Sequence, residues 1–257
     1  MRTLSKFLIT GSALLIASQS TAFSKTIEFS ADAVIGMPQQ APRTTRLYVG
    51  KNAVRRESVI NGQNVIEIVF PEKGKALLIN EQLKSYKERQ FPNQSKTKKI
   101  NPCEQMQNAT CEKLGTENID GLKTEKWQII TINQGRRVRT LHWIDTKRKL
   151  AIREFFPDGS VSELKMLNKE KINKRDTEKW QRTLSRPDGQ SIKSYQWYDT
   201  KLKIAIKEEL AGGFSRELKN IKESRQPDKL FSVPAGYMKI DKVGNNNNRP
   251  VYPQQGM

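Results

Sequence analysis

Hydrophobic and polar residues alternate with a period of two through most of the chain. Leu150 and Ile152, for example, fall on one face of a strand and Arg153 on the other. Turn residues interrupt the alternation at a spacing of about 8–12 residues, which is typical of antiparallel all-β domains. We therefore expect strands over residues 25–37, 44–49, 53–60, 63–70, 75–79, 85–89, 126–132, 136–145, 150–156 and 161–167.

Short sequences mark the tight turns between these strands. Asn61-Gly62 stands between two hydrophobic runs and is the strongest hairpin signal in the chain. Residues 157–160, Pro-Asp-Gly-Ser, predict another turn, because proline presets φ and glycine accepts positive φ. Two prolines predict a loop over residues 37–43. Near the C-terminus, residues 227–231 are expected to form one helical turn and residues 232–240 an edge strand.

The stretch from residue 124 to residue 221 contains one unit written twice. Residues 124–128 return as 177–181, 143–147 as 197–201, 151–154 as 205–208 and 163–165 as 217–219. The two copies span residues 124–168 and 177–221, and all four tryptophans lie at equivalent positions in them. The repeat predicts two successive strand meanders of the same design.

Within each copy, the alternation separates aromatic from charged side chains. One sheet face is therefore apolar and must be covered by other parts of the protein or by a ligand. Aromatic side chains dominate core burial, so packing in a core is the simpler interpretation. The alternative is a concave cavity for an apolar ligand. The candidate ligand-binding residues are Trp127, Leu141, Trp143, Trp180, Tyr195 and Trp197.

The two ends of the chain differ from the alternating middle. Residues 1–24 are typical of a secretory signal peptide, because Arg2 and Lys6 precede an apolar run too short to span a bilayer as a helix. Residues 241–257 include four consecutive asparagines and are expected to be disordered. Residues 25–240 should form a single β domain of a periplasmic protein.

One segment, residues 102–114, has helical composition, with Pro102 at its first position and a glycine beyond its end. It contains Cys103 and Cys111. In a straight helix these residues would lie about 12 Å apart along the axis, whereas a disulfide needs Cα atoms within about 7 Å. Either the helix breaks and a disulfide forms, or the chain has two separate thiols. Export favours the break and the disulfide.

Several of these features together resemble a known superfamily. The signal sequence, the serial hairpins, the Trp-Ile-Asp-Thr-Lys strand end at 143–147 and the closing Leu-Phe-Ser-Val-Pro-Ala-Gly-Tyr at 230–237 resemble the periplasmic lipoprotein carriers, the LolA/LolB-like proteins, in an uncharacterised branch. The resemblance spans residues 25–240. It implies a mainly β fold: a strongly curved antiparallel meander sheet, or open half-barrel, with one or two short covering helices. It also implies an apolar cavity for acyl chains, covered in part by residues 102–114.

The chain offers no residues for a known catalytic centre. Its one histidine, His142, has Gln196 as its repeat counterpart and is expected on the strand face opposite Trp143. One histidine and two distant cysteines make no zinc site, and no glycine-rich nucleotide motif is present. We therefore expect no enzyme, no metal and no cofactor.

Charge suggests a second possible function. Lysine and arginine number 46 against 27 acidic residues, which gives a net charge of +19, and they cluster at residues 96–99, 136–139, 147–149 and 169–175. A solvated outer sheet face would account for this charge. The first hypothesis is an envelope carrier or binder of a lipid, a lipoprotein acyl chain or another apolar ligand. The second is a non-enzymatic scaffold whose basic surface contacts an anionic envelope surface or a protein partner. Nucleic acid is unlikely for an exported protein, and no transmembrane segment is expected.

Overall fold

The computed structural model describes residues 27–60, 62–91, 102–105, 109–133 and 135–240. Three single turns of 3-10 helix accompany the strands: η1 (Pro71–Lys73), η2 (Pro102–Gln105) and η3 (Asp228–Phe231). The strands are β1 (Phe29–Met37), β2 (Gln40–Val49), β3 (Val54–Ile60), β4 (Gln63–Phe70), β5 (Lys75–Asn80), β6 (Ser85–Gln90), β7 (Ala109–Ile119), β8 (Leu122–Asn133), β9 (Arg136–Asp145), β10 (Ala151–Phe155), β11 (Val161–Ile172), β12 (Arg175–Ser185), β13 (Ser191–Asp199), β14 (Ile204–Glu209), β15 (Ser215–Glu223) and β16 (Met238–Lys239).

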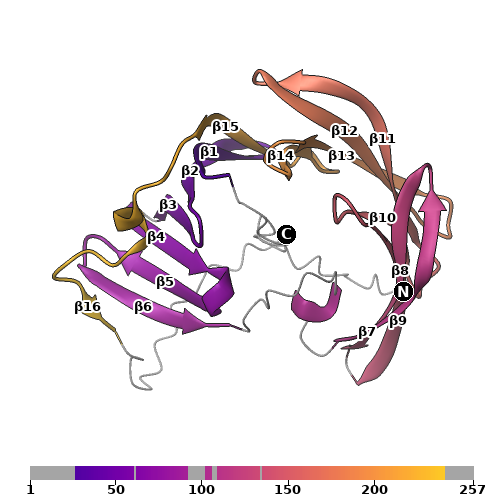
Figure 1. Ribbon diagram of the computed structural model, residues 1–257, viewed down its shortest axis with the longest axis horizontal. Helices are drawn as coiled ribbons and strands as arrows, with labels where there is room; N and C mark the ends of the chain where they lie inside the picture. The colour runs from indigo at the N-terminus through magenta and orange to yellow at the C-terminus, as the bar shows by residue number, and fades with distance from the viewer. Residues whose placement is uncertain (1–26, 61, 92–101, 106–108, 134, 241–257) are drawn as a thin grey trace, which may run out of the picture.

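All of these strands belong to one curved sheet. Its order is β16-β6-β5-β4-β3-β2-β1-β15-β14-β13-β12-β11-β10-β9-β8-β7, so β1 and β15 join the two halves of the chain. Neighbouring strands are antiparallel except for β16, which runs parallel to β6. The sheet bends into an open arc whose edges are β7 and β16 (Figure 1). The expected mainly β, strongly curved, open architecture is confirmed.

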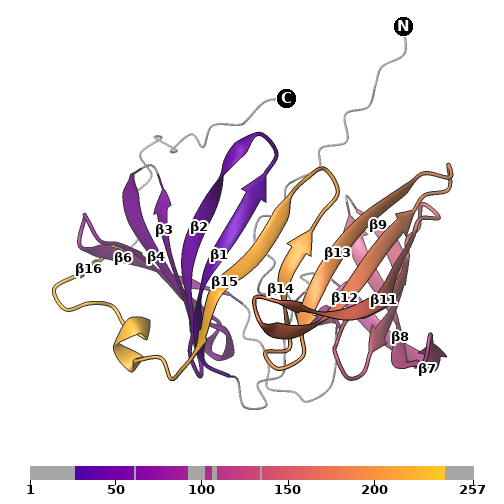
Figure 2. The same ribbon diagram turned by 90° about the horizontal axis from the view of Figure 1, so that it is seen from above.

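The two faces of the sheet can be told apart by what lies on them. The turn η2 lies inside the arc and η3 lies outside it, as the magenta and gold helical turns in Figure 1 show; Figure 2 shows the gold turn of η3 again from above. The disulfide attaches η2 to Cys111, and Cys111 pairs with Ile129, so these residues mark the concave face. The η3 segment packs on Ile66 and Ile68, which mark the convex face. The strand register then places every other strand side chain on the concave or the convex face, because directly paired residues share a face.

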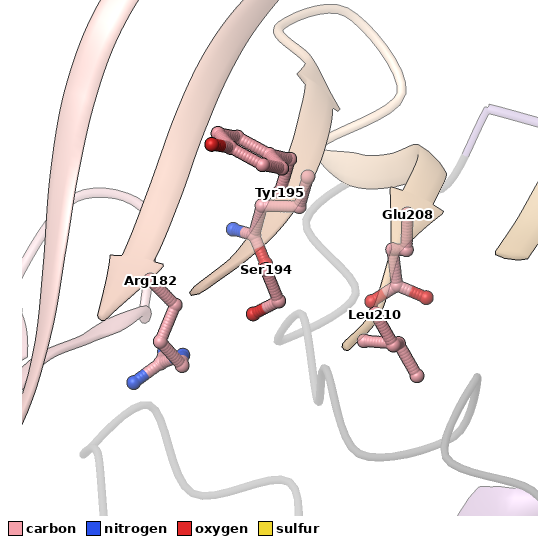
Figure 3. Close-up of a pocket in the computed structure, with 6 residues that line it drawn as sticks. Arg182, Ser194, Tyr195, Glu208 and Leu210 are labelled. Carbon is pink, nitrogen blue, oxygen red and sulfur yellow. The ribbon is translucent and has the colours of Figure 1, made fainter. Parts of the chain in front are cut away.

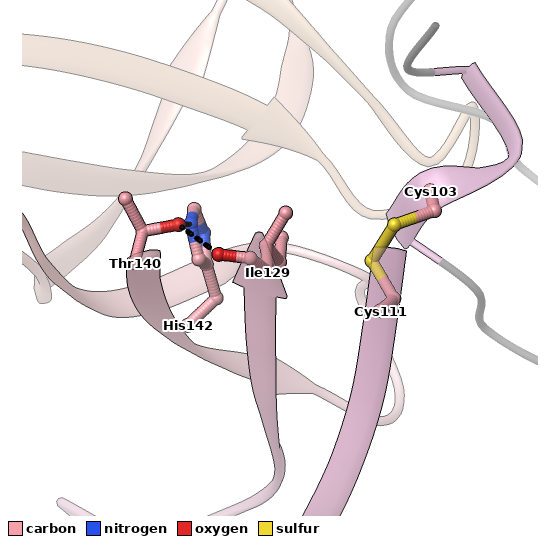
Figure 4. The surroundings of a disulfide bond; sticks show 5 residues. All are labelled: Cys103, Cys111, Ile129, Thr140 and His142. Carbon is pink, nitrogen blue, oxygen red and sulfur yellow. Dashed lines mark hydrogen bonds between the residues drawn. A yellow bond between two sulfur atoms is a disulfide. The ribbon is translucent and has the colours of Figure 1, made fainter. Parts of the chain in front are cut away.

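The helix expected over residues 102–114 is wrong. Among the described residues of this segment, only Pro102–Gln105 is helical, and β7 begins at Ala109 and pairs with β8 along nearly its whole length. Local composition favoured a helix, but pairing with the long neighbouring strand overrides it. The predicted bond between Cys103 and Cys111 is confirmed, with the Cα atoms 5.8 Å apart. The covering element is therefore a single helical turn held by that disulfide (Figure 4).

The loop expected over residues 37–43 is also wrong, because β2 already begins at Gln40. The register between β1 and β2 shifts after Ile35, so Pro42 lies beside a bulge, where a residue without an N–H is tolerated. The expected hairpin between β3 and β4 is confirmed by the pair Ile60 and Gln63, while Asn61 lies outside the described residues. The expected helical turn near residue 230 is η3, and the expected edge strand is only the two residues of β16.

The repeated sequence produces repeated irregularities in the sheet. The register between β7 and β8 shifts between Lys113 and Gly115, and that between β11 and β12 shifts between Met166 and Asn168. A further shift occurs at equivalent points of β10 and β14. Bulges bend a strand and increase its twist. The curvature of this half of the sheet therefore follows from the repeat.

Three hydrophobic clusters stabilise the sheet. Two of them are built from repeat-equivalent residues, and the third lies on the convex face under the η3 segment. Gly50 is required at this third cluster, because a Cβ there would lie 2.6 Å from the Phe231 ring. The equivalent pairs in the first two clusters are Ile119 and Ile172, Leu150 and Ile204, Ile152 and Ile206, and Leu164 and Leu218.

Candidate ligand-binding site

Two tryptophans at repeat-equivalent positions lie on the convex face under lysine side chains. Trp143 donates a hydrogen bond of 2.7 Å to Glu117, and the Lys126 ammonium lies 4.8 Å from its ring centre. Trp197 donates to Glu170, and its ring contacts two lysines at 4.8 and 4.4 Å. Both rings are 5% exposed or less. These tryptophans are therefore packed and partnered in this structure rather than lining an open cavity.

The six sequence-predicted site residues do not share one surface. Four of them are on the convex face: Leu141, Trp143, Tyr195 and Trp197. Trp127 pairs with His142 and Trp180 pairs with Gln196, which places these two on the concave face. Trp180 is fully buried in a core cluster. The difference arises because each copy carries its two tryptophans at positions of opposite strand parity. The concave face therefore carries polar side chains such as Gln196 beside core residues such as Trp180 and Leu164.

On the concave face, polar side chains of the first copy form a network with Arg182 of the second copy. His142 Nδ1 lies 3.1 Å from Glu154, and its Nε2 lies 2.9 Å from the Thr140 hydroxyl (Figure 4). Arg182 donates to Glu154 at 2.8 Å and to the Ser162 hydroxyl at 2.7 Å. Burial raises the pKa of Glu154, but the hydrogen bond with His142 and the charge of Arg182 outweigh burial and hold it below its usual value.

The second copy has the same geometry with fewer hydrogen bonds. Gln196, Glu208 and Arg216 pair in register across β13, β14 and β15. Arg216 forms an ion pair with Glu208. However, the amide nitrogen of Gln196 and the Nε of Arg216 are buried and have no hydrogen-bond partner. An unpaired buried donor costs about 1–3 kcal/mol. These two N–H groups are therefore places where a ligand oxygen would bind favourably.

A pocket of about 120 Å³ opens beside these groups (Figure 3). It is lined by Arg182, Ser194, Gln196, Glu208 and Leu210, and also by the sequence-predicted Tyr195, whose ring points away from the other lining side chains (Figure 3). Complete small-molecule sites enclose roughly 300–1,000 Å³. This pocket can therefore hold a head group or a few carbon atoms, and the rest of a larger ligand would lie outside it.

Exposed apolar side chains continue from the pocket along one rim of the concave face. Leu210 and Phe214 oppose each other across the β14–β15 turn, where the Leu210 N–H donates to the Phe214 carbonyl at 2.8 Å. Ile35 pairs with Arg216 and so lies on the same face. The three are 44%, 47% and 38% exposed. Leu184 and Ile192 pair on the neighbouring strands. We call these five residues the concave apolar strip: Ile35, Leu184, Ile192, Leu210 and Phe214.

The polar residues of this site are not among the residues predicted from the sequence. The alternation of Ser194 and Gln196 with the aromatic residues was visible, and it placed them on the face opposite Trp197. Which face is concave depends on the direction of sheet curvature, and no local pattern gives that direction. Arg182 and Glu154, which form a hydrogen bond here, are 28 residues apart in the chain, so no local pattern predicts their contact.

In the part of the chain that the structure describes, no three or more histidine, cysteine, aspartate or glutamate side chains come together in a way that could hold a metal ion. No helix among these residues has the length and apolarity needed to cross a membrane.

The chain belongs to the family described as a domain of unknown function, DUF4412, which matches residues 34–237. No curated protein matches it.

Solved structures similar to this chain include LolA-like proteins. A LolA superfamily protein from Nitrosomonas europaea is 12% identical, with a TM-score of 0.35, and the match covers 81% of this chain and 91% of that one. A putative outer membrane lipoprotein-sorting protein domain from Vibrio parahaemolyticus is 11% identical, with the same TM-score and coverage. A DUF1329 family protein from Desulfovibrio piger is 14% identical, with a TM-score of 0.29 and again the same coverage. These similarities, to the group of proteins that the sequence resembles, concern the fold alone.

Proposed function

We propose that this protein is an exported, non-enzymatic binder or carrier of a lipid or another ligand with an acyl chain. The ligand binds on the concave face of the curved sheet. One observation carries the proposal: the exposed Leu210 and Phe214 of the concave apolar strip lie beside a pocket lined by Gln196, whose buried amide nitrogen has no hydrogen-bond partner. An amphiphile would complement both parts of this arrangement, because its apolar chain would cover the strip and its polar head would accept the hydrogen bond.

The apolar side of the proposal has a simple energetic basis. Contiguous exposed apolar side chains on a soluble protein mark binding surfaces more often than isolated ones do. Fully burying a leucine, isoleucine or phenylalanine side chain contributes about 1.5–3 kcal/mol. Since Ile35, Leu210 and Phe214 are about half exposed, covering them would contribute roughly half of that each. A bound acyl chain would therefore gain a few kcal/mol along the strip.

A second candidate function uses the basic surface. The start of β9 carries three exposed arginines, Arg136, Arg137 and Arg139. They lie apart from the ion pairs that neutralise many of the other charges on the strands. Exposed like charges of this kind attract anionic surfaces. In this alternative the protein is a scaffold that contacts an anionic envelope surface or a protein partner and fills its own core.

Native mass spectrometry of the protein purified from its producing cells tests the proposal. We expect a bound amphiphile that organic extraction removes. The variant Leu210→Asn should retain less of it, while the control Leu83→Asn, an exposed leucine in the β5–β6 turn, should retain as much as the unaltered protein. A folded preparation that holds no amphiphile and takes up none when one is added would contradict the proposal and favour the scaffold alternative.

A further inference from the structure

The second copy of the repeat differs from the first at the positions of Gln196 and Arg216. In the first copy, the position of Gln196 is occupied by His142, which has partners on both ring nitrogens. The position of Arg216 is occupied by Ser162, whose hydroxyl accepts a hydrogen bond from Arg182. In the second copy, Gln196 and Arg216 each retain a buried N–H without a partner. In the first copy the equivalent positions are paired, with Arg182 of the second copy as a donor, and the buried donor without a partner is the Trp127 indole N–H. In the second copy the unpaired donors are at Gln196 and Arg216 themselves.

From this difference we propose that the pocket beside Gln196 and Arg216 is a subsite for the uncharged carbonyl group of an acyl ester or amide. The inference rests on the proposed function, because it assigns the head group of the same acyl ligand. The Gln196 amide and the Arg216 Nε–H donate to the carbonyl oxygen. The acyl chain leaves the pocket past Leu210 and continues along the concave apolar strip.

The charge of the subsite selects an uncharged acceptor over a carboxylate. Arg216 is already paired with Glu208, and Arg182 with Glu154. The two arginines and two glutamates balance, so no excess positive charge remains to neutralise an anionic head group. Glu208 itself lines the pocket and would repel a carboxylate. A carbonyl oxygen accepts the two hydrogen bonds without adding charge to a partly buried site.

The size of the pocket agrees with this assignment. A volume of about 120 Å³ admits an ester or amide group with the first carbons of its chain, but not a whole acyl chain. Leu210 is the apolar residue that lines the pocket, and it also belongs to the concave apolar strip. The polar and apolar parts of the ligand would therefore meet at this residue.

The test uses the purified full chain and two fluorescent probes with the same pyrene-labelled acyl chain, one a free fatty acid and the other its glycerol monoester. Fluorescence titration should give a lower Kd for the monoester. Gln196→Leu removes the amide donor at nearly constant size and should raise the monoester Kd by about 5- to 30-fold, the equivalent of one to two kcal/mol. Arg216→Lys retains the charge beside Glu208, removes the Nε–H and should act in the same direction.

The matched control is Gln181→Leu, which makes the same substitution on the convex face of β12, where Gln181 donates to Thr183. It should leave both Kd values unchanged. If both probes bind but neither Gln196→Leu nor Arg216→Lys weakens the monoester, the carbonyl subsite is wrong while the proposed function stands. Tighter binding of the free acid than of the monoester would also overturn the subsite. If neither probe binds to the unaltered, folded protein, the proposed function itself fails.

Discussion

The two copies of the internal repeat share a core but differ in the polar residues that face the hollow of the sheet. Equivalent residues build both hydrophobic clusters, and equivalent threonines, Thr124 and Thr177, donate to equivalent backbone carbonyls at 2.8 and 2.7 Å. On the concave face, His142 and Glu154 of the first copy form a closed network with Arg182. The two copies thus share the packing of their hydrophobic clusters, while their polar side chains on the concave face differ.

This difference indicates which residues maintain the fold and which residues are available to bind a ligand. Residues that repeat between the copies are mainly those that the fold needs, such as Trp143 and Trp197 with their lysine contacts. Residues that do not repeat, such as Gln196 against His142, are free to serve a ligand. The predictions below test whether the copies differ as this account requires.

The largest effect is expected from Trp180→Ala. Trp180 is fully buried in the first cluster, where it packs with Leu164 and Ile152. Its removal should lower the free energy of unfolding by about 3–5 kcal/mol, as measured by urea denaturation. Small residues, Ala31 and Ala33, pack against Leu218 in the second cluster. Ala33→Gly should therefore cost much less, and equal losses for the two variants would contradict this account of the cores.

Trp143→Ala and Trp197→Ala form a matched pair across the copies. Both rings are buried, hydrogen-bonded to a glutamate and covered by lysine. Each variant should lose roughly 3 kcal/mol, at the lower end of the range for core aromatic residues, because the covering groups are flexible. Ligand uptake should survive in both variants, since these residues lie on the convex face. Loss of uptake without loss of stability would show that the aromatic face binds the ligand.

Reduction of the disulfide should affect the first copy's edge of the sheet and not the second copy. The bond between Cys103 and Cys111 closes a short loop, whose constraint is worth about 2–3 kcal/mol in the loop-entropy model. Hydrogen exchange after reduction should become faster in β7 and remain slow in β12 and β13. Two thiols that titrate in unreduced protein from its native compartment would show that the bond is absent there.

The smallest effect concerns pH and the closed network. The folded pKa of Glu154 lies below its unfolded value, so the stability that this group contributes is present above about pH 4.5 and is lost as pH falls through the folded pKa. Each unit of pKa depression is worth about 1.4 kcal/mol. The unfolding free energy of the wild type should fall between pH 5 and pH 3 by more than that of Glu154→Gln. Parallel pH curves for the two proteins would contradict the network.

Sequence patterns predicted most strands and the disulfide, because period-two alternation, turn residues and cysteine pairing are local signals. The strand over residues 109–119 was missed, since its pairing with β8 outweighs a helical composition. The ligand site was assigned to aromatic residues such as Trp143, whereas the pocket lies among polar residues on the other face. Its formation depends on the direction in which bulges curve the sheet and on contacts between distant strands, and neither is encoded locally.

The central claim is that the unpaired donors of Gln196 and Arg216 in the second copy bind the ligand. The most direct test is a nuclear magnetic resonance titration of the full chain with a monoacylglycerol. The side-chain amide signal of Gln196 and the Nε–H signal of Arg216 should shift as the ligand binds. The ring signals of His142 and the indole signals of Trp143 and Trp197 should stay in place. Saturable binding that moves the indole or His142 signals and leaves Gln196 and Arg216 unchanged would contradict the account.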